Sequence, residues 1–150
     1  MRSTAARILL HGLAAVLLLA PTSARAQAPE PPLPTADALF DAQVLQRVDL
    51  LMHSADWAKL KENFRENDYY PADLTWNGLT VRNAGIRSRG TGSRSGVKPG
   101  LRVDFNRYAD QDFLGLKSVV LDNLTQDASG IHETVTMALY ARLGIPAPRE

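Results

Sequence analysis

The chain reads DLTWNGLTVRNAGIRSR over residues 73–89, and this stretch carries the clearest local signal in the sequence. Asn77-Gly78 at its centre predicts a tight β-hairpin, because both positions of such a turn require a positive φ. The arms, residues 73–76 and 79–89, are expected to pair as antiparallel strands. The second arm leads directly into a loop of small residues, Gly90-Thr91-Gly92-Ser93-Arg94-Ser95-Gly96.

Two further elements are predicted before this hairpin. Residues 46–52 alternate apolar and polar side chains, which is typical of a half-buried strand. A helix follows, with Ser54 as its expected N-cap. Its apolar face is formed by Trp57, Leu60 and Phe64, whose spacing matches one side of a helix.

Three elements are predicted after the loop. Leu101, Val103 and Phe105 form the apolar face of a strand, and residues 116–121 are expected to form a more deeply buried one. A helix is predicted from about residue 130 to residue 143, capped by Ser129 and ended by Gly144. Its expected apolar stripe consists of Ile131, Val135, Ala138, Leu139 and Leu143. The order of elements predicts an α+β fold, a mostly antiparallel sheet with two packed helices.

The N-terminal part predicts export. Residues 1–28 combine a basic start, an apolar run over residues 8–20 and small residues suited to cleavage, so they are predicted to be a signal peptide. The run is too short for a membrane span, and no stable span is expected after cleavage. Residues 29–45 begin with a proline-rich linker, and residues 46–150 form the domain. The 150-residue chain has no cysteine, so no disulfide framework is available.

The basic residues are concentrated in one region. The signal peptide contains three of the 17 basic residues and none of the 16 acidic ones, which leaves the mature chain at about −2. Between residues 82 and 107 the only acid is Asp104, against the basic residues Arg82, Arg87, Arg89, Arg94, Lys98, Arg102 and Arg107. A local patch on a chain of negative net charge favours a specific anionic ligand over general nucleic-acid binding.

Four of these cations are candidates for binding phosphate. Arg87 and Arg89 lie two apart on a predicted strand and share a face, and Arg102 lies on the returning strand. Arginine binds phosphate oxygens in pairs of hydrogen bonds, and Lys98 could add a point charge. The alternative is a solvated face whose arginines pair with acids such as Asp104. The glycine-rich loop matches neither a Walker A motif nor G-x-G-x-x-G.

Glu133 is a further candidate, because a carboxylate in the first helical turn could orient a phosphate-binding cation. Acids also favour helix N-termini for electrostatic reasons alone. His132 has no partner at metal-ligand spacing, and Asn123 and Asp127 are expected to cap the helix. No motif for a catalytic nucleophile, catalytic acid or base, or metal site is present, so no catalytic or metal-binding residue is assigned.

Several segments resemble, in order, the N-terminal part of the CotH-type proteins, a family of atypical protein kinases that are exported or associated with the spore coat. The likeness spans about residues 46–150. It is carried by residues 69–75, 81–90, 98–106, 115–117 and 121–133. One position departs from the family pattern: Thr91 stands where an asparagine is often found after the Arg-Gly pair.

The resemblance implies a kinase-like fold, ATP and Mg²⁺ as cofactors, and phosphoryl transfer to a protein Ser or Thr. It places Arg87, Arg89, Lys98 and Arg102 on the phosphate side of a nucleotide site. The family's catalytic and metal-binding aspartates lie beyond the matched segments. The resemblance therefore predicts an incomplete domain, an N-terminal fragment that binds nucleotide and is inactive alone.

Two other functions remain open at this point. The same basic patch could make the chain a non-catalytic secreted module that binds an anionic polymer or a protein partner. A third possibility is a piece of a fold whose sheet lacks its remaining strands, which would expose apolar surface and aggregate.

Overall fold

The computed structural model describes residues 33–149. The predicted signal peptide and the first residues of the predicted linker lie outside this range. Within it, no helix is both long enough and apolar enough to cross a lipid bilayer.

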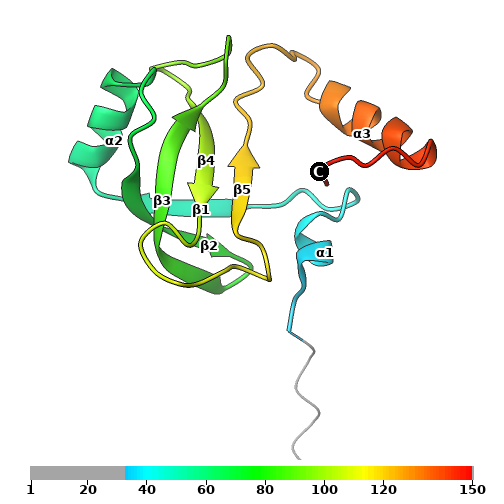
Figure 1. Cartoon of the computed structure of the whole chain (residues 1–150), viewed down its shortest axis with the longest axis horizontal. Helices are drawn as coiled ribbons and strands as arrows, with labels where there is room; N and C mark the ends of the chain where they lie inside the picture. Colours follow the sequence, from blue (N-terminus) through cyan, green and yellow to red (C-terminus); the bar gives the residue numbers. More distant parts are fainter. Residues whose placement is uncertain (1–32, 150) are drawn as a thin grey trace, which may run out of the picture. The chain divides into compact units, whose positions relative to one another are not determined.

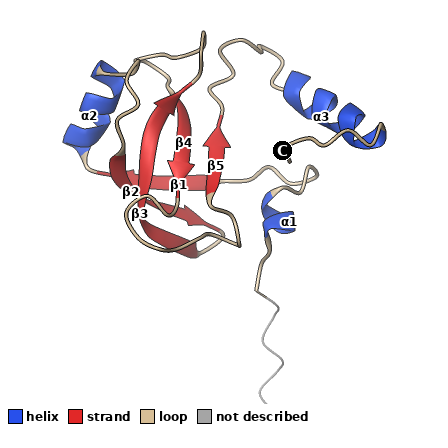
Figure 2. Ribbon diagram, viewed as in Figure 1, coloured by secondary structure: helices blue, strands red, loops and turns tan. Residues whose placement is uncertain are grey.

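A five-stranded antiparallel sheet is the main element of the described chain (Figures 1 and 2), with the strand order β1-β2-β3-β4-β5. The strands are β1 (Val48–Met52), β2 (Tyr70–Trp76), β3 (Leu79–Arg89), β4 (Gly100–Asp104) and β5 (Ser118–Leu121). Each strand pairs with the next one along the chain, so the connections are local. With its helices, this sheet confirms the predicted α+β fold class.

The hairpin predicted at Asn77-Gly78 joins β2 to β3. Asn77 has a φ of 47° and Gly78 a φ of 77°, as the turn requires. Strand β2 begins at Tyr70 rather than at the expected Asp73.

Strand β3 contains a β-bulge at Asn83. Leu74 of β2 pairs with Val81, whereas Ala72 pairs with Ala84, so β3 has an extra residue between these pairs. Asn83 has a φ of 56°, and its backbone N–H donates to the carboxylate of Asp73 at 2.9 Å. After the bulge Ala84, Ile86 and Ser88 are buried towards the core, which leaves Gly85, Arg87 and Arg89 on the opposite face of the sheet.

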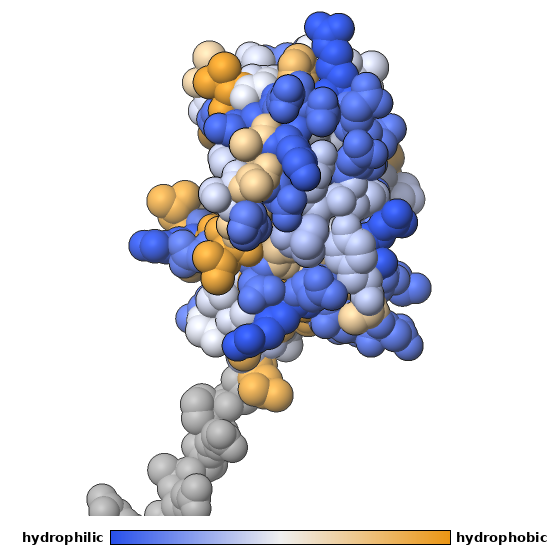
Figure 3. Space-filling view, turned by 90° about the vertical axis from the view of Figure 1, so that its left-hand side faces the viewer, coloured by the Kyte–Doolittle hydropathy of each residue, from blue (hydrophilic) through white to orange (hydrophobic). Residues whose placement is uncertain are grey.

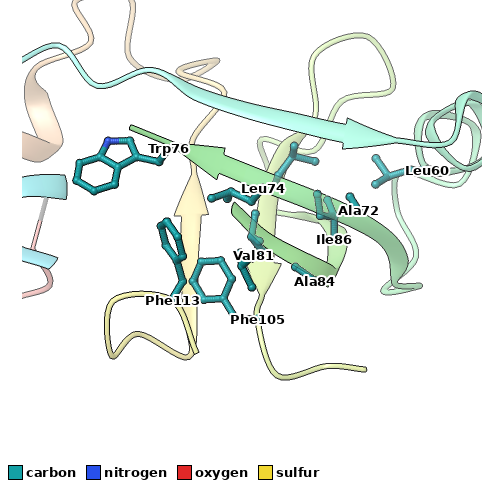
Figure 4. Close-up of a cluster of buried hydrophobic side chains, with 11 residues drawn as sticks. Leu60, Ala72, Leu74, Trp76, Val81, Ala84, Ile86, Phe105 and Phe113 are labelled. Atoms are coloured by element: carbon teal, nitrogen blue, oxygen red, sulfur yellow. The ribbon is translucent and has the colours of Figure 1, made fainter. Parts of the chain in front are cut away.

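The hydrophobic core covers one face of the sheet (Figure 4). Leu74, Ile86 and Val103 from three neighbouring strands are almost fully buried. Phe105 and Phe113, from the segment between β4 and β5, close one end of the core with ring centroids 5.4 Å apart. The full set of buried apolar residues is Leu60, Ala72, Leu74, Trp76, Val81, Ala84, Ile86, Leu101, Val103, Phe105 and Phe113.

Helix α2 (Ser54–Glu62) packs on this core through Leu60, which is 1% exposed. The predicted N-cap is wrong by one residue. His53 holds the cap position because its Nδ1 accepts a hydrogen bond from the backbone of Ala55 at 3.3 Å, and Ser54 is already helical. The side of the molecule on which α2 lies is mostly hydrophilic (Figure 3).

The predicted linker contains a short helix, α1 (Ala36–Leu39), which the proline-rich composition gave no reason to expect. Leu39 of this helix packs against the edge of the core.

The C-terminal elements are less buried than predicted. Strand β5 was expected to be deeply buried, but it is an edge strand and its Val120 is 48% exposed. Helix α3 (His132–Arg142) has no buried residue, so the predicted packing of this helix on the sheet is not found. Its apolar stripe, residues Ile131, Val135, Leu139 and Leu143, is 53–63% exposed. Gly144 follows the helix with a φ of 69°, as predicted for a C-terminal stop.

Candidate functional site

The arginines of β3 and β4 lie on the face of the sheet opposite the core. Arg87 and Arg102 are direct cross-strand partners. Two residues further along β3, Arg89 pairs with Gly100. Two guanidinium groups at directly opposite positions repel each other, so their side chains need acceptors nearby.

Tyr69 and Asp104 supply these acceptors. The Arg87 Nε donates to the Tyr69 hydroxyl at 3.1 Å, and this hydroxyl donates to Asp104 at 2.8 Å. Arg102 Nε lies 3.4 Å from the same carboxylate oxygen of Asp104, and its Nη2 donates to Ser118 at 3.3 Å. Arg87 also donates to the side-chain oxygen of Asn67 at 3.0 Å. Both arginines are therefore engaged with the protein itself.

Gly85 creates the space for this arrangement. The ring of Tyr69 lies beneath the guanidinium of Arg107, 4.6 Å from the ring centroid, while Arg87 lies 5.6 Å from the same centroid. A Cβ at Gly85 would approach Arg107 Cβ and Cγ to 2.6 Å and Tyr69 Cδ1 to 2.9 Å. Only a residue without a side chain leaves room for Arg107 and Tyr69 to pack against the strand at this position.

Arg89 points into a different environment. Its Nη1 lies 3.4 Å from the carboxylate of Asp122, and the two side chains are 37% and 38% exposed. Both line a cavity of about 870 Å³ that is bounded by β5, the loop after β3 and the start of α3. The other lining residues are Phe40, Ser93, Leu116, Ser118, Val119, Val120, Leu124, Gln126, Asp127, Gly130, His132, Glu133, Thr134, Pro148 and Arg149.

The structure distributes the predicted site residues over three places. Arg89 and Glu133 line the same cavity. Arg87 and Arg102 occupy the adjoining sheet face but do not line it. Lys98 is exposed at the end of the loop, and within the described residues its ammonium group makes no ion pair. Glu133 likewise makes no ion pair with any described residue.

The glycine-rich loop, residues 90–99, joins β3 to β4 and approaches the cavity at Ser93. Within the described part of the chain, the backbone N–H groups of residues 91–96 donate to no protein acceptor. Arg94, which the sequence counts with the basic patch, is used within the protein. Its guanidinium donates to the carbonyl of Gly90 at 2.8 Å and to Asn67 at 2.6 Å.

Asp127 caps α3 from five residues before His132, the first residue of the helix. It accepts from the Ser129 hydroxyl at 2.5 Å and from the backbone N–H of His132 at 2.8 Å. The hydrogen bond from Ser129 is the main reason that the pKa of Asp127 is lowered to about 2. Ser129, the predicted cap, contributes a weaker contact, because its hydroxyl accepts from the backbone N–H of Ile131 at 3.3 Å.

Sequence reasoning did not identify Tyr69, Ser93 and Asp122 as neighbours of the arginines. The first lies before the hairpin and the last after β5, so nothing in the spacing connects them with β3. Among residues 33–149 no group of three or more His, Cys, Asp or Glu side chains is arranged to hold a metal ion.

The model of the CotH kinase protein family matches residues 86–150. The predicted resemblance is thereby confirmed for this part of the chain, which includes the end of β3, the glycine-rich loop and α3. No curated protein matches the chain.

Proposed function

We propose that the cavity beside Arg89 binds the phosphates of ATP, and that the chain is the nucleotide-binding part of an exported CotH-like protein kinase. Such a kinase transfers a phosphoryl group from ATP to a Ser or Thr hydroxyl of a protein. The family match supports a kinase-like protein with a nucleotide and a protein substrate. The signal-peptide features of residues 1–28 support export.

The observation that carries the proposal is the environment of Arg89. Its partner Asp122 is a single carboxylate in an exposed pair, and such pairs contribute about 0–1 kcal/mol. A phosphate group accepts paired hydrogen bonds from one guanidinium and brings more charge. A polyphosphate can therefore replace Asp122 as the partner of Arg89 at small cost.

The glycine-rich loop supports the same placement. Its backbone N–H groups at residues 91–96 have no acceptor within the described chain, and Ser93 lies at the cavity wall. Backbone N–H groups that lack a protein acceptor are available to donate to phosphate oxygens. The loop and Arg89 would then contact the same phosphate chain from two sides.

The remaining predicted residues have supporting parts in this proposal. Arg87 and Arg102 are held on the adjoining sheet face and raise the positive potential near the cavity. Lys98, whose ammonium group makes no ion pair with a described residue, is available to a phosphate that extends past the loop. Glu133 lines the cavity, where it can orient a cation such as Arg89 once a ligand has displaced Asp122.

The described residues do not form a complete catalytic site. ATP-dependent kinases hold divalent ions with carboxylates placed around the phosphates. No such group is found among residues 33–149, so these residues do not fit Mg²⁺ alone. We therefore assign no step of phosphoryl transfer to this part of the chain, and propose that it is a fragment that binds nucleotide without turning it over.

Calorimetric titration of the chain with ATP tests the proposal. Arg89→Ala should weaken binding by about tenfold, which corresponds to about 1.4 kcal/mol. Arg82→Ala is the matched control, because Arg82 belongs to the same strand and basic run but does not line the cavity. Equal affinities for the wild type and Arg89→Ala would contradict the proposed site.

The alternative function is a non-catalytic secreted module that binds an anionic polymer or a protein partner. The exposed position of Lys98, outside the cavity, is the observation that favours it. Binding of any polyanion with a similar affinity, steeply reduced by salt and unaffected by Arg89→Ala, would support this function over nucleotide binding.

A further inference from the structure

The glycine-rich loop has two anchors. Arg94 holds one side of it to the segment after α2. Its guanidinium donates to the backbone carbonyls of Arg65 at 2.5 Å and Glu66 at 2.8 Å, in addition to Gly90 and Asn67. Arg65, Glu66 and Asn67 belong to the segment that follows α2, so Arg94 connects the loop to that segment.

Asn123 holds the other side. This side chain is only 3% exposed, and its Nδ2 donates to the carbonyls of Ser93 at 2.7 Å and Lys98 at 3.0 Å. Its Oδ1 accepts from the backbone of Thr125 at 3.2 Å. A buried amide with all these groups satisfied is costly to replace, because its loss leaves two loop carbonyls without a donor.

The loop is closely packed, both against α2 and within itself. A Cβ at Gly96 would lie 2.7 Å from the carbonyl oxygen of Lys61, and one at Gly90 would lie 2.5 Å from the Ser93 hydroxyl. The Ser95 hydroxyl accepts from the backbone of Val97 and of Lys98, each at 3.1 Å. These contacts fix the loop carbonyls, while the N–H groups of residues 91–96 remain without an acceptor in the described chain.

We propose that Asn123 and Arg94 are positioning residues that hold the glycine-rich loop in its anion-binding conformation before any ligand arrives. The proposal rests on the proposed function for the identity of the ligand, but the ordering of the loop does not depend on it. A loop that is ordered in advance does not lose conformational freedom on binding, which increases affinity. A glycine-rich loop is usually flexible, and the two anchors are the reason that we expect this one to be ordered.

Backbone ¹⁵N relaxation of the free 150-residue chain tests the ordering. In the wild type, the order parameters of residues 91–97 should be close to the value of about 0.85 that is typical of a rigid backbone. Asn123→Ala should lower them below about 0.6. Arg94→Ala is a second route to the same effect at a more exposed site, in case the Asn123 variant does not fold. The matched controls are Asn106→Ala, an exposed asparagine after β4, and Arg82→Ala.

Two results would overturn the proposal. One is a loop that is already flexible in the wild type. The other is a loop whose order parameters are unchanged in both anchor variants. Titration of the same samples with ATP then addresses the positioning role: both anchor variants should bind about tenfold more weakly with unchanged folding. If the loop becomes flexible in the anchor variants but they bind ATP with the affinity of the wild type, that role is refuted. A wild type that is ordered but does not bind ATP contradicts the proposed function and leaves the ordering established.

Discussion

At the scale of single residues, Gly85 and Tyr69 explain how two arginines can face each other across neighbouring strands. The tyrosine hydroxyl connects Arg87 to the carboxylate of Asp104, and its ring lies beneath Arg107. From the sequence, a bound anion would be expected to offset the repulsion between these two arginines. In the structure the hydroxyl of Tyr69 and the carboxylate of Asp104 offset it instead. The cations that line the cavity are Arg89 and Arg149, the latter near the end of the described chain.

Gly85→Ala is expected to destabilise the fold by about 1–3 kcal/mol, the usual cost of forcing an additional methyl group into a packed site. The new Cβ would meet the Cβ and Cγ of Arg107 at 2.6 Å, near the root of that side chain, so rotating its distant end does not relieve the clash. Urea unfolding followed by tryptophan fluorescence measures the effect. Gly92→Ala is the control, because its Cβ would have no neighbour nearer than 3.6 Å. Equal urea midpoints for both variants would show that Arg107 and Tyr69 are not tightly packed against Gly85.

At the scale of elements, α3 differs from α2 in what stabilises it. Helix α2 buries Leu60 against the sheet, whereas α3 has no buried residue. Helices of this length are marginal in water without tertiary packing. The cap formed by Asp127 is therefore a larger part of the stability of α3 than a cap usually is.

The helicity of α3 should depend on pH. The pKa of Asp127 is lowered to about 2 in the folded chain, below its usual value near 4. The carboxylate therefore stabilises the folded form above about pH 4, and this contribution is lost as the pH falls towards 2. The ¹³Cα shifts of residues 132–142 should move towards coil values over that range.

Asp127→Asn should weaken this pH response of α3, because the charged acceptor is absent at every pH. Asp110→Asn, in an exposed loop, should leave the response unchanged. Identical titrations for the wild type and Asp127→Asn would exclude Asp127 as the group responsible.

At the scale of the whole molecule, the described chain leaves apolar surface uncovered. The stripe on α3 is exposed, and an apolar groove beside α1 is lined by Leu39, Val48, Leu74, Phe105 and Val119. Exposed apolar surface of this kind promotes association. The chain is expected to self-associate as its concentration rises.

The double variant Val135→Glu, Leu139→Glu should reduce this association and change the free energy of unfolding by less than about 0.5 kcal/mol, since both side chains are more than half exposed. Sedimentation velocity over a range of concentrations measures the association. Ala58→Glu, on the exposed side of α2, controls for added charge. Unchanged association in the double variant, or equal reduction by Ala58→Glu, would show that the stripe is not responsible.

What could be predicted from the sequence follows the range of the interactions involved. Asn77-Gly78 determines the hairpin through local φ preferences, and the alternation in residues 101–105 predicts β4 correctly. The predicted burial of β5 was wrong, because an apolar run such as Val119, Val120 and Leu121 occurs in central strands and in edge strands alike. The pairing of an arginine with Asp104, which the sequence offered as the alternative to a bound anion, is confirmed by the Arg102–Asp104 ion pair. The positions of Tyr69 and Asp122 beside the arginines depend on strand register, which short-range patterns do not contain.

The extra residue at Asn83 has a consequence for how this strand can vary. Side chains alternate between the two faces of a strand, so strict alternation from the buried Val81 would place Arg87 and Arg89 towards the interior and Ile86 towards water. The bulge absorbs one residue and prevents this exchange. Deleting Asn83 would leave a regular strand in which Ala84 and Ile86 still face the core. A deletion between Ala84 and Arg89 would exchange the two faces beyond it, so it should be far more harmful than deleting Asn83.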